Sequence, residues 1–147
     1  MTRVLVLNGP NLNLLGTREP EIYGHTTLAE IEDRLRQRGA ELGLEIACFQ
    51  SNHEGELIDR LQERDFDWAI VNAAGLTHTS VSLRDALKGI GRPFVEVHIS
   101  DPDQREDFRK VNFLHDIAAD RIVGKGAAGY TMALELISDR IGGGQPR

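Results

Sequence analysis

The sequence lacks the features that stabilise secreted proteins or anchor proteins in membranes. It has one cysteine, Cys48, so no disulfide can form within the chain, which suits a reducing compartment. No apolar run approaches the roughly 20 residues that cross a bilayer, and Met1–Val4 has no signal-peptide layout. We therefore expect a cytoplasmic protein without membrane contact, in which Cys48 is a buried structural thiol.

Positive charge is also in short supply. The chain has 17 Lys and Arg against 23 Asp and Glu, a formal net charge of -6. This charge repels polyanions at long range, and no concentrated basic patch offsets it, so we expect no nucleic-acid partner. A small anionic ligand remains compatible, because a few converging arginines suffice to bind one.

Motifs for cofactors and metals are missing as well. Residues Gly124–Gly129 match the G-x-G-x-x-G pattern, but the second βα unit and the ribose-binding acid of a dinucleotide fold do not follow. The five histidines include no H-E-x-x-H pair and no Cys–His cluster. We expect neither a cofactor nor a metal ion.

The apolar pattern that is present predicts one α/β domain. Short β-branched runs alternate with helix-period segments, as in a parallel sheet covered by helices on both faces. The five expected strands are Arg3–Leu7, Leu44–Gln50, Trp68–Val71, Phe94–Ile99 and Arg121–Val123. Their order favours a flavodoxin-like fold over 1–141, followed by a mobile glycine-rich tail over 142–147.

Capping residues and apolar spacing predict the helices. Thr27 with Glu30 forms a capping box for the first helix, and Ser51 with Glu54 repeats the pattern for the second. The third helix carries Leu83, Ala86, Leu87 and Ile90, and the last carries Tyr130, Ala133, Leu134, Ile137 and Ile141.

The expected strands end in polar residues, and in open α/β sheets ligands bind beyond these carboxyl ends. The residues there are Asn8-Gly9-Pro10-Asn11, Ser51-Asn52-His53, Asn72, and His98 with Ser100. Each alone is typical of a turn. Their joint occurrence predicts a functional site at this edge of the sheet.

The connection from Asn8 to His25 is longer than the two to six residues usual for a βα loop, which is typical of a binding loop. It contains Arg18 and Tyr23, and a guanidinium near a phenol favours the phenolate, so that Tyr23 could act as a base. The alternative is that Tyr23 only packs on the surface while Arg18 pairs with Glu19 or Glu21.

The fourth expected strand places Glu96 and His98 on one face. A carboxylate beside an imidazole stabilises its protonated form, which describes a general acid. The alternative is an edge strand whose solvated face carries both residues. Arg105 and Arg109, four apart, are expected on one face of a helix, with surface pairing as their default role.

Four segments of the chain resemble the type II 3-dehydroquinate dehydratases. They are Asn8–Pro20 with Ile22-Tyr23-Gly24, then Gln50–Gly55, then Asn72–Asp85, and finally Glu96–Ser100 with Arg105 and Arg109. The resemblance implies a cofactor-free anti elimination of water from 3-dehydroquinate through an enolate. This step serves aromatic amino-acid biosynthesis in the shikimate pathway, or quinate breakdown.

The same resemblance implies a role for each site residue. Tyr23 would be the base and His98, paired with Glu96, the acid, while Arg18 keeps Tyr23 ionised and Asn11 positions a water. Substrate would be bound by Asn72, His78, Asp85, Arg109 and the backbone amides of Ile99 and Ser100. The family implies trimers assembled into a dodecamer, in which Asp85 reaches a neighbouring subunit.

Two segments depart from the family pattern. Ala73–Leu76 stands where Pro-Gly-Ala-aromatic is frequent, and Asp101–Asp103 where Asn-Val-His is frequent, which puts an extra carboxylate near an anionic substrate. The main alternative function is a non-catalytic flavodoxin-like module that binds a ligand, since this fold hosts many functions.

Overall fold

The structure, a computed structural model, describes residues 1–17 and 19–143. Its strands are β1 Arg3–Asn8, β2 Glu45–Gln50, β3 Trp68–Asn72, β4 Phe94–His98 and β5 Asp120–Val123. Its α-helices are α1 Pro20–Tyr23, α2 Leu28–Leu42, α3 Glu54–Gln62, α4 Val81–Ile90 and α5 Ala128–Gly143. Short 3-10 helices are η1 Leu12–Leu14, η2 Ala74–His78, η3 Pro102–Gln104, η4 Asp107–Lys110 and η5 His115–Ile117.

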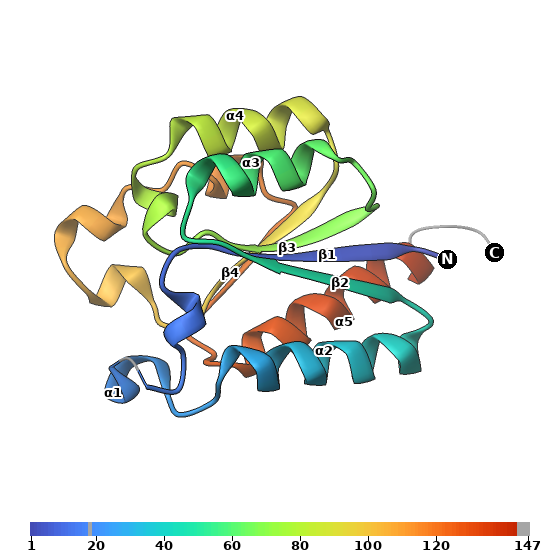
Figure 1. Ribbon diagram of the computed structural model, residues 1–147, viewed down its shortest axis with the longest axis horizontal. Helices are drawn as coiled ribbons and strands as arrows, with labels where there is room; N and C mark the ends of the chain where they lie inside the picture. Colours follow the sequence, from blue (N-terminus) through green and yellow to red (C-terminus); the bar gives the residue numbers. More distant parts are fainter. Residues whose placement is uncertain (18, 144–147) are drawn as a thin grey trace.

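The five strands form one parallel sheet in the order β2-β1-β3-β4-β5. Helices α3 and α4 cover one face and α2 and α5 cover the other (Figure 1). This arrangement confirms the predicted flavodoxin-like α/β fold, and all five strands lie within two residues of the predicted bounds. No helix in the described ranges is long and apolar enough to span a bilayer.

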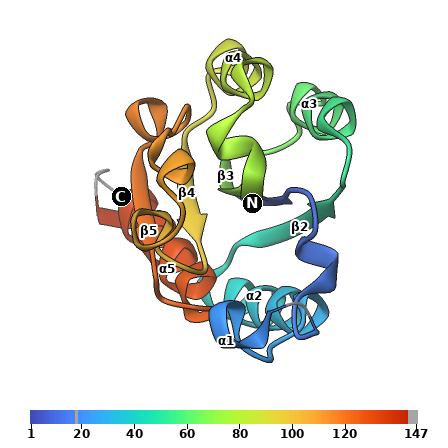
Figure 2. The ribbon, with the colours of Figure 1, turned by 90° about the vertical axis from the view of Figure 1, so that its left-hand side faces the viewer.

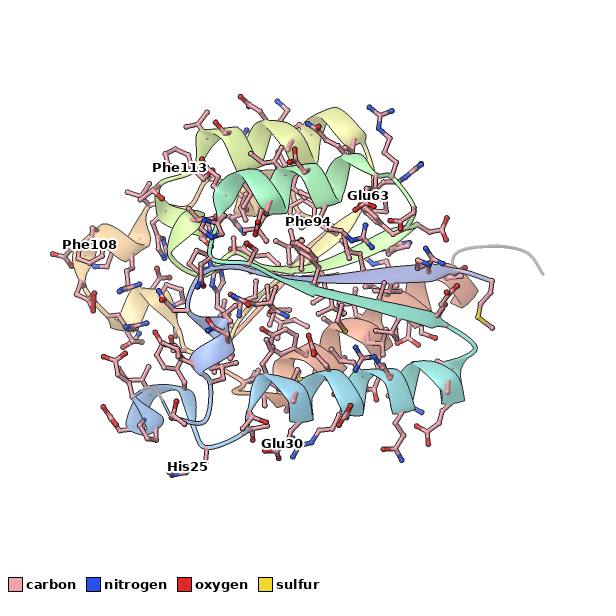
Figure 3. All side chains as sticks on the ribbon, viewed as in Figure 1. His25, Glu30, Glu63, Phe94, Phe108 and Phe113 are labelled. Carbon is pink, nitrogen blue, oxygen red and sulfur yellow. The ribbon has the colours of Figure 1, made fainter. Side chains whose placement is uncertain are left out.

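Each face of the sheet has its own apolar core. Val4 and Val6 pack with α2 and α5, whereas Leu5 and Leu7 pack with α3 and α4, because successive side chains of a strand point to opposite faces. Burial on both faces explains the nearly continuous apolar run of this strand. Figure 3 shows Phe94 inside the molecule, between the sheet and the α3–α4 layer.

One of the two predicted capping boxes is confirmed and the other is wrong. Thr27 Oγ1 accepts from the Glu30 amide over 3.2 Å, and Glu30 reaches back to the Thr27 amide. Helix α3 instead starts after His53, which makes no side-chain cap. Glu54, the expected partner of Ser51, accepts a hydrogen bond from Ser80 in front of α4, so a contact between helices replaces the local one.

The last helix runs further than predicted. The side chains Tyr130, Ala133, Leu134 and Ile137 are fully buried, as expected from their spacing. Helix α5 continues through Gly143, two residues past the predicted domain boundary at 141. Residues 144–147 of the predicted tail lie outside the described residues.

The carboxyl ends of the strands gather at one end of the molecule, opposite the N-terminus (Figure 1). Helix α1 and the segment between β4 and β5 lie at this end, which Figure 2 views directly. The chain order reverses between β1 and β3, since β2 lies to one side of β1 and β3 to the other. Ligands of open α/β sheets bind at such a switch point.

Candidate active site

A pocket opens at the switch point, with a cavity volume of about 130 Å³. This is far below the roughly 300–1,000 Å³ of sites for drug-sized ligands, so the pocket suits a small metabolite. Eight of the predicted site residues line it: Asn11, Tyr23, Asn72, His78, His98, Ile99, Ser100 and Arg109. Pro10, Leu12, Ala74, Gly75, Pro102 and Arg105 complete the lining.

The floor of the pocket is formed where β1 and β3 end side by side. The Gly9 amide donates to the Asn72 carbonyl over 2.8 Å. A Cβ at Gly9 would lie 2.5 Å from the carbonyl oxygen of Ala73, so only glycine permits this approach. The amide of Asn11 is held by Asn52 Oδ1 at 3.0 Å. The polar residues after β2 thus support the pocket from behind and do not line it.

A buried tyrosine joins the same two strand ends. The Tyr130 hydroxyl donates to Asn8 Oδ1 over 2.6 Å and accepts from Asn72 Nδ2 over 2.9 Å. Asn72 Oδ1 accepts from the Ala74 amide, so both ends of this side-chain amide are occupied within the protein. The apolar spacing predicted the burial of Tyr130 but gave no sign of its hydroxyl's role.

His98 and Glu96 form a buried pair on β4. His98 Nε2 bonds Glu96 Oε2, and because a carboxylate only accepts, Nε2 must carry a proton. This leaves the other ring nitrogen, Nδ1, for a ligand in the pocket. Glu96 is 0% exposed and His98 6%. The alternative of an edge strand with a solvated face is wrong, since β4 lies between β3 and β5.

Three neighbours hold the Glu96 carboxylate. Besides His98, Asn112 Nδ2 donates to Oε2 over 2.7 Å, and Arg121 Nε lies 3.5 Å from Oε1. Burial raises the pKa of this carboxyl, but the bonds from His98 and Asn112 and the charge of Arg121 outweigh burial and lower the pKa overall. Glu96 therefore stays ionised and presents a charged acceptor to His98 Nε2.

His78 lies next to His98, with ring centroids 6.4 Å apart and planes inclined by 21°. Its Nδ1 contacts the Val111 carbonyl at 2.6 Å, and since a carbonyl only accepts, Nδ1 carries the proton. Burial is the main cause that lowers the pKa of His78. A neutral His78 presents Nε2 as an acceptor, which suits a ligand hydroxyl.

Tyr23 lines the pocket from the α2–α5 side of the sheet, whereas His98 shares its strand face with Phe94, on the α3–α4 side. Tyr23 is partly buried against the α2–α5 core. Arg105 Nη1 donates to the phenol oxygen over 2.6 Å, and the guanidinium carbon lies 5.3 Å from the ring centre. A positive charge donating to this oxygen stabilises negative charge that develops there. Arg18, the predicted partner of Tyr23, lies outside the described residues.

The prediction that Arg105 and Arg109 share a helix is wrong. Arg105 follows η3, whereas Arg109 lies within η4. Both still pair with Glu106, Arg109 at 2.7 Å and Arg105 at 3.9 Å. Both also line the pocket, so surface pairing and a pocket role occur together.

The two family departures have different places. Ala74 and Gly75 line the pocket, and Ala74 has a φ of 53°, which an alanine adopts only with strain. The Asp101 carboxylate accepts from the Asp103 amide at 3.0 Å and thereby caps η3. Asp101 is not among the lining residues, so the extra carboxylate serves the local turn.

Asp85 does not reach this pocket. It is exposed on α4, in a groove between α3 and α4. In this arrangement Asp85 therefore cannot contact a ligand in the pocket of its own chain.

The described residues include no group of three or more His, Cys, Asp or Glu side chains placed to hold a metal ion. The pocket instead holds the His98 imidazole, bonded to the buried Glu96 carboxylate, on one side and the Tyr23 phenol, bonded to the Arg105 guanidinium, on the other. Two separate proton-transfer groups on opposite sides of one cavity can act as general acid and general base on a small molecule.

Comparisons with known proteins agree with this geometry. The family model described as dehydroquinase class II matches residues 2–138. A 3-dehydroquinate dehydratase of Prochlorococcus marinus is 53% identical over 139 residues, covering 93% of this chain and 95% of that protein. A catabolic 3-dehydroquinase of Podospora anserina is 50% identical, covering 95% of each chain.

Solved structures point the same way. The crystal structure of a type II dehydroquinase from Butyrivibrio crossotus superposes with a TM-score of 0.90 at 38% identity, covering 92% of this chain and 97% of that one. A 3-dehydroquinate dehydratase-like protein from Bifidobacterium longum gives a TM-score of 0.70 at 29% identity, covering 96% of this chain and 98% of that one. The chain belongs to the class II dehydroquinase family.

Proposed function

We propose that this chain is a hydro-lyase that removes water from 3-dehydroquinate to give 3-dehydroshikimate, without a cofactor or metal ion. The single observation that carries the proposal is the opposition of Tyr23 and the His98–Glu96 pair across one small pocket. Membership of the class II dehydroquinase family and relatives at about 50% identity over nearly the whole chain support it.

The reaction runs through an enolate. The Tyr23 phenolate takes the proton beside the ketone, the electron pair of that C–H bond forms a C=C bond, and the π pair of the carbonyl moves onto its oxygen. The enolate then collapses and expels the hydroxyl group on the adjacent carbon, which takes a proton from His98 and leaves as water. Tyr23 ends protonated and His98 neutral, so one proton must pass from Tyr23 to His98 through solvent before the next cycle.

The remaining site residues bind and polarise the substrate. Asn72, His78 and Arg109 contact its hydroxyl groups, and the amides of Ile99 and Ser100, just beyond β4, take its carboxylate. Asn11 positions a water near the enolate oxygen. Arg18 and Arg105 stabilise the phenolate of Tyr23, Arg105 by the hydrogen bond described above. The pocket thus offers donors where negative charge develops.

We further propose that the protein works in the cytoplasm as a homo-oligomer, a dodecamer built from trimers. The position of Asp85 supports this, because an exposed carboxylate outside its own pocket can bind substrate only in a neighbouring subunit. Sedimentation analysis should give the dodecamer mass. Asp85→Ala should raise KM for 3-dehydroquinate without changing the unfolding of the isolated subunit.

The activity is tested by following ultraviolet absorbance over time after 3-dehydroquinate is added to protein treated with a metal chelator. Dehydration creates a conjugated enone that the substrate lacks. We expect a steady rise that Tyr23→Phe reduces by about 10²–10⁴-fold. A flat trace from folded, assembled wild-type protein would instead support the non-catalytic ligand-binding module.

A further inference from the structure

Asn112 lies behind the acid side of the pocket, in the segment that joins β4 to β5. Its Nδ2 donates to Glu96 Oε2 over 2.7 Å, the oxygen that also bonds His98 Nε2. Asn112 does not line the pocket. Any influence of Asn112 on a ligand must therefore pass through Glu96 and His98.

The orientation of the Asn112 amide is determined by its surroundings. Its Oδ1 accepts from the Leu114 amide at 2.7 Å and from the His115 amide at 2.9 Å. Backbone amides only donate, so the oxygen of Asn112 must face them and the nitrogen must face Glu96. The turn into η5 thus presents a preset donor to the carboxylate.

Apart from His98, no charged group around Glu96 in the described residues makes a hydrogen bond to its carboxylate. His98 on β4, Arg121 on β5 and His78 on η2 face the carboxylate, with Arg109 of η4 near His78. Arg121 Nε lies 3.5 Å from Oε1 and makes no hydrogen bond there. Without Asn112, the bond from His98 alone would hold Glu96 Oε2 against the attraction of Arg121.

We propose that Asn112 is a positioning residue for the acid His98, which it serves by holding Glu96 Oε2 against His98 Nε2. The carboxylate then keeps the proton on Nε2 and presents protonated Nδ1 to the departing hydroxyl. This inference rests on the proposed dehydration, because only there does His98 need to donate a proton.

Two substitutions of Asn112 separate its contact with Glu96 from its support of the turn before η5. Asn112→Asp keeps an oxygen for the Leu114 and His115 amides but places a second carboxylate oxygen against Glu96, so that one proton is retained between them. Asn112→Ser also keeps an oxygen for those amides, but it is too short to reach Glu96.

We expect Asn112→Asp to lower kcat roughly tenfold at neutral pH, as for loss of a hydrogen bond to a charged group. KM should change by less than about twofold, because Asn112 makes no pocket contact. The acid limb of the kcat profile should move to higher pH, because Glu96 becomes protonated earlier. Asn112→Ser should lower kcat and move the acid limb to higher pH as well, each by a smaller amount than Asn112→Asp.

Asp116→Asn is the matched control for loosening of the same segment. Asp116 pairs with Arg84, which also donates to the Phe113 carbonyl over 2.8 Å, and neither contacts Glu96. We expect the pH profile of Asp116→Asn to equal that of wild type. An equal shift in this control would overturn the proposal, as would an unshifted acid limb in folded Asn112→Asp.

A measurement without substrate keeps this test separate from the proposed activity. In the unliganded protein, a nuclear magnetic resonance titration of the Glu96 carboxyl should have its midpoint at higher pH in Asn112→Asp. An unmoved midpoint refutes the role of Asn112 whatever the turnover. Absent turnover in wild type refutes the dehydration, while the titration still decides whether Asn112 controls Glu96.

Discussion

The two sides of the pocket are built in different ways. His98 and Glu96 stand on β4, a strand paired on both sides, and both are buried. Tyr23 lies in the four-residue helix α1, within the long connection between β1 and α2. Glu19 and Gly24, which flank this helix, both have positive φ angles. The acid side is therefore part of the sheet, whereas the base side belongs to a loop.

This difference determines what holds each group in place. Ladder hydrogen bonds and two apolar cores position β4, so His98 needs only local support from Glu96 and Asn112. Tyr23 depends on a contact from a segment 82 residues away, through the hydrogen bond of Arg105. Sites on strands are held more precisely than sites on loops. We expect the base side to respond more strongly to changes outside the sheet.

The largest expected effect is on the acid side. His98→Ala removes the proton donor for the departing hydroxyl, and we expect kcat to fall by about 10²–10⁴-fold in the absorbance assay. His115→Ala, an exposed histidine outside the pocket, is the control and should keep wild-type turnover. If His98→Ala kept wild-type turnover, the assignment of the acid would be wrong.

A smaller loss is expected from substitution of Arg105, which contacts the base Tyr23. Arg105→Met keeps an apolar stem but removes the donor to the Tyr23 oxygen, so kcat should fall roughly tenfold, as for one hydrogen bond to a developing charge. Arg34→Met, at an exposed position of α2 outside the pocket, is the control. A rise in KM with unchanged kcat would mean that Arg105 binds substrate and does not support Tyr23.

Removing one hydroxyl that is bound to the ends of β1 and β3 and one that lies in the loop sharpens the comparison between sheet and loop. Tyr130→Phe leaves Asn8 Oδ1 and Asn72 Nδ2 without their buried partner, so the free energy of unfolding should fall by about 1–3 kcal/mol. Tyr23→Phe should lower it by less than about 1 kcal/mol, because its contact is partly exposed. Urea denaturation measures both. Equal losses would mean that the Tyr130 hydroxyl holds the ends of β1 and β3 no more strongly than the Tyr23 hydroxyl holds the loop.

No effect on turnover is expected at Cys48, on edge strand β2 away from both sides. Burial raises the pKa of its thiol to about 11, so the unreactive thiol form dominates at neutral pH. Cys48→Ala should keep wild-type kcat, and iodoacetamide should label native protein slowly at pH 7 and faster as pH approaches that pKa. Fast labelling of native protein at neutral pH would contradict this account.

Much of the fold could be predicted from local pattern. The alternation of β4 side chains between the two faces of the sheet and the box of Thr27 with Glu30 depend on neighbours in sequence, and both agree with the structure. The box of Ser51 with Glu54 failed because Glu54 pairs with Ser80, 26 residues away on another helix. The shared helix of Arg105 and Arg109 failed because two short 3-10 turns replace it.

The site residues also divide into those that local sequence predicted and those that only contacts distant in sequence revealed. Residue types at the strand ends and the family resemblance pointed to eight residues that the fold brings to one pocket. Spacing alone did not reveal the hydroxyl role of Tyr130, whose partners are 122 and 58 residues away. Nor did it reveal Asn112, 16 residues beyond Glu96 on an irregular segment without periodicity.

The sequence by itself determined the parallel sheet, its helices and the polar residues after each strand, because these follow from side-chain periodicity and turn chemistry within a few residues. Only the tertiary structure decided that β4 is an inner strand, that Glu96 is buried and held by Asn112, and that Arg105 meets Tyr23. Those contacts join residues far apart in the chain, so their energies depend on packing that no local pattern records.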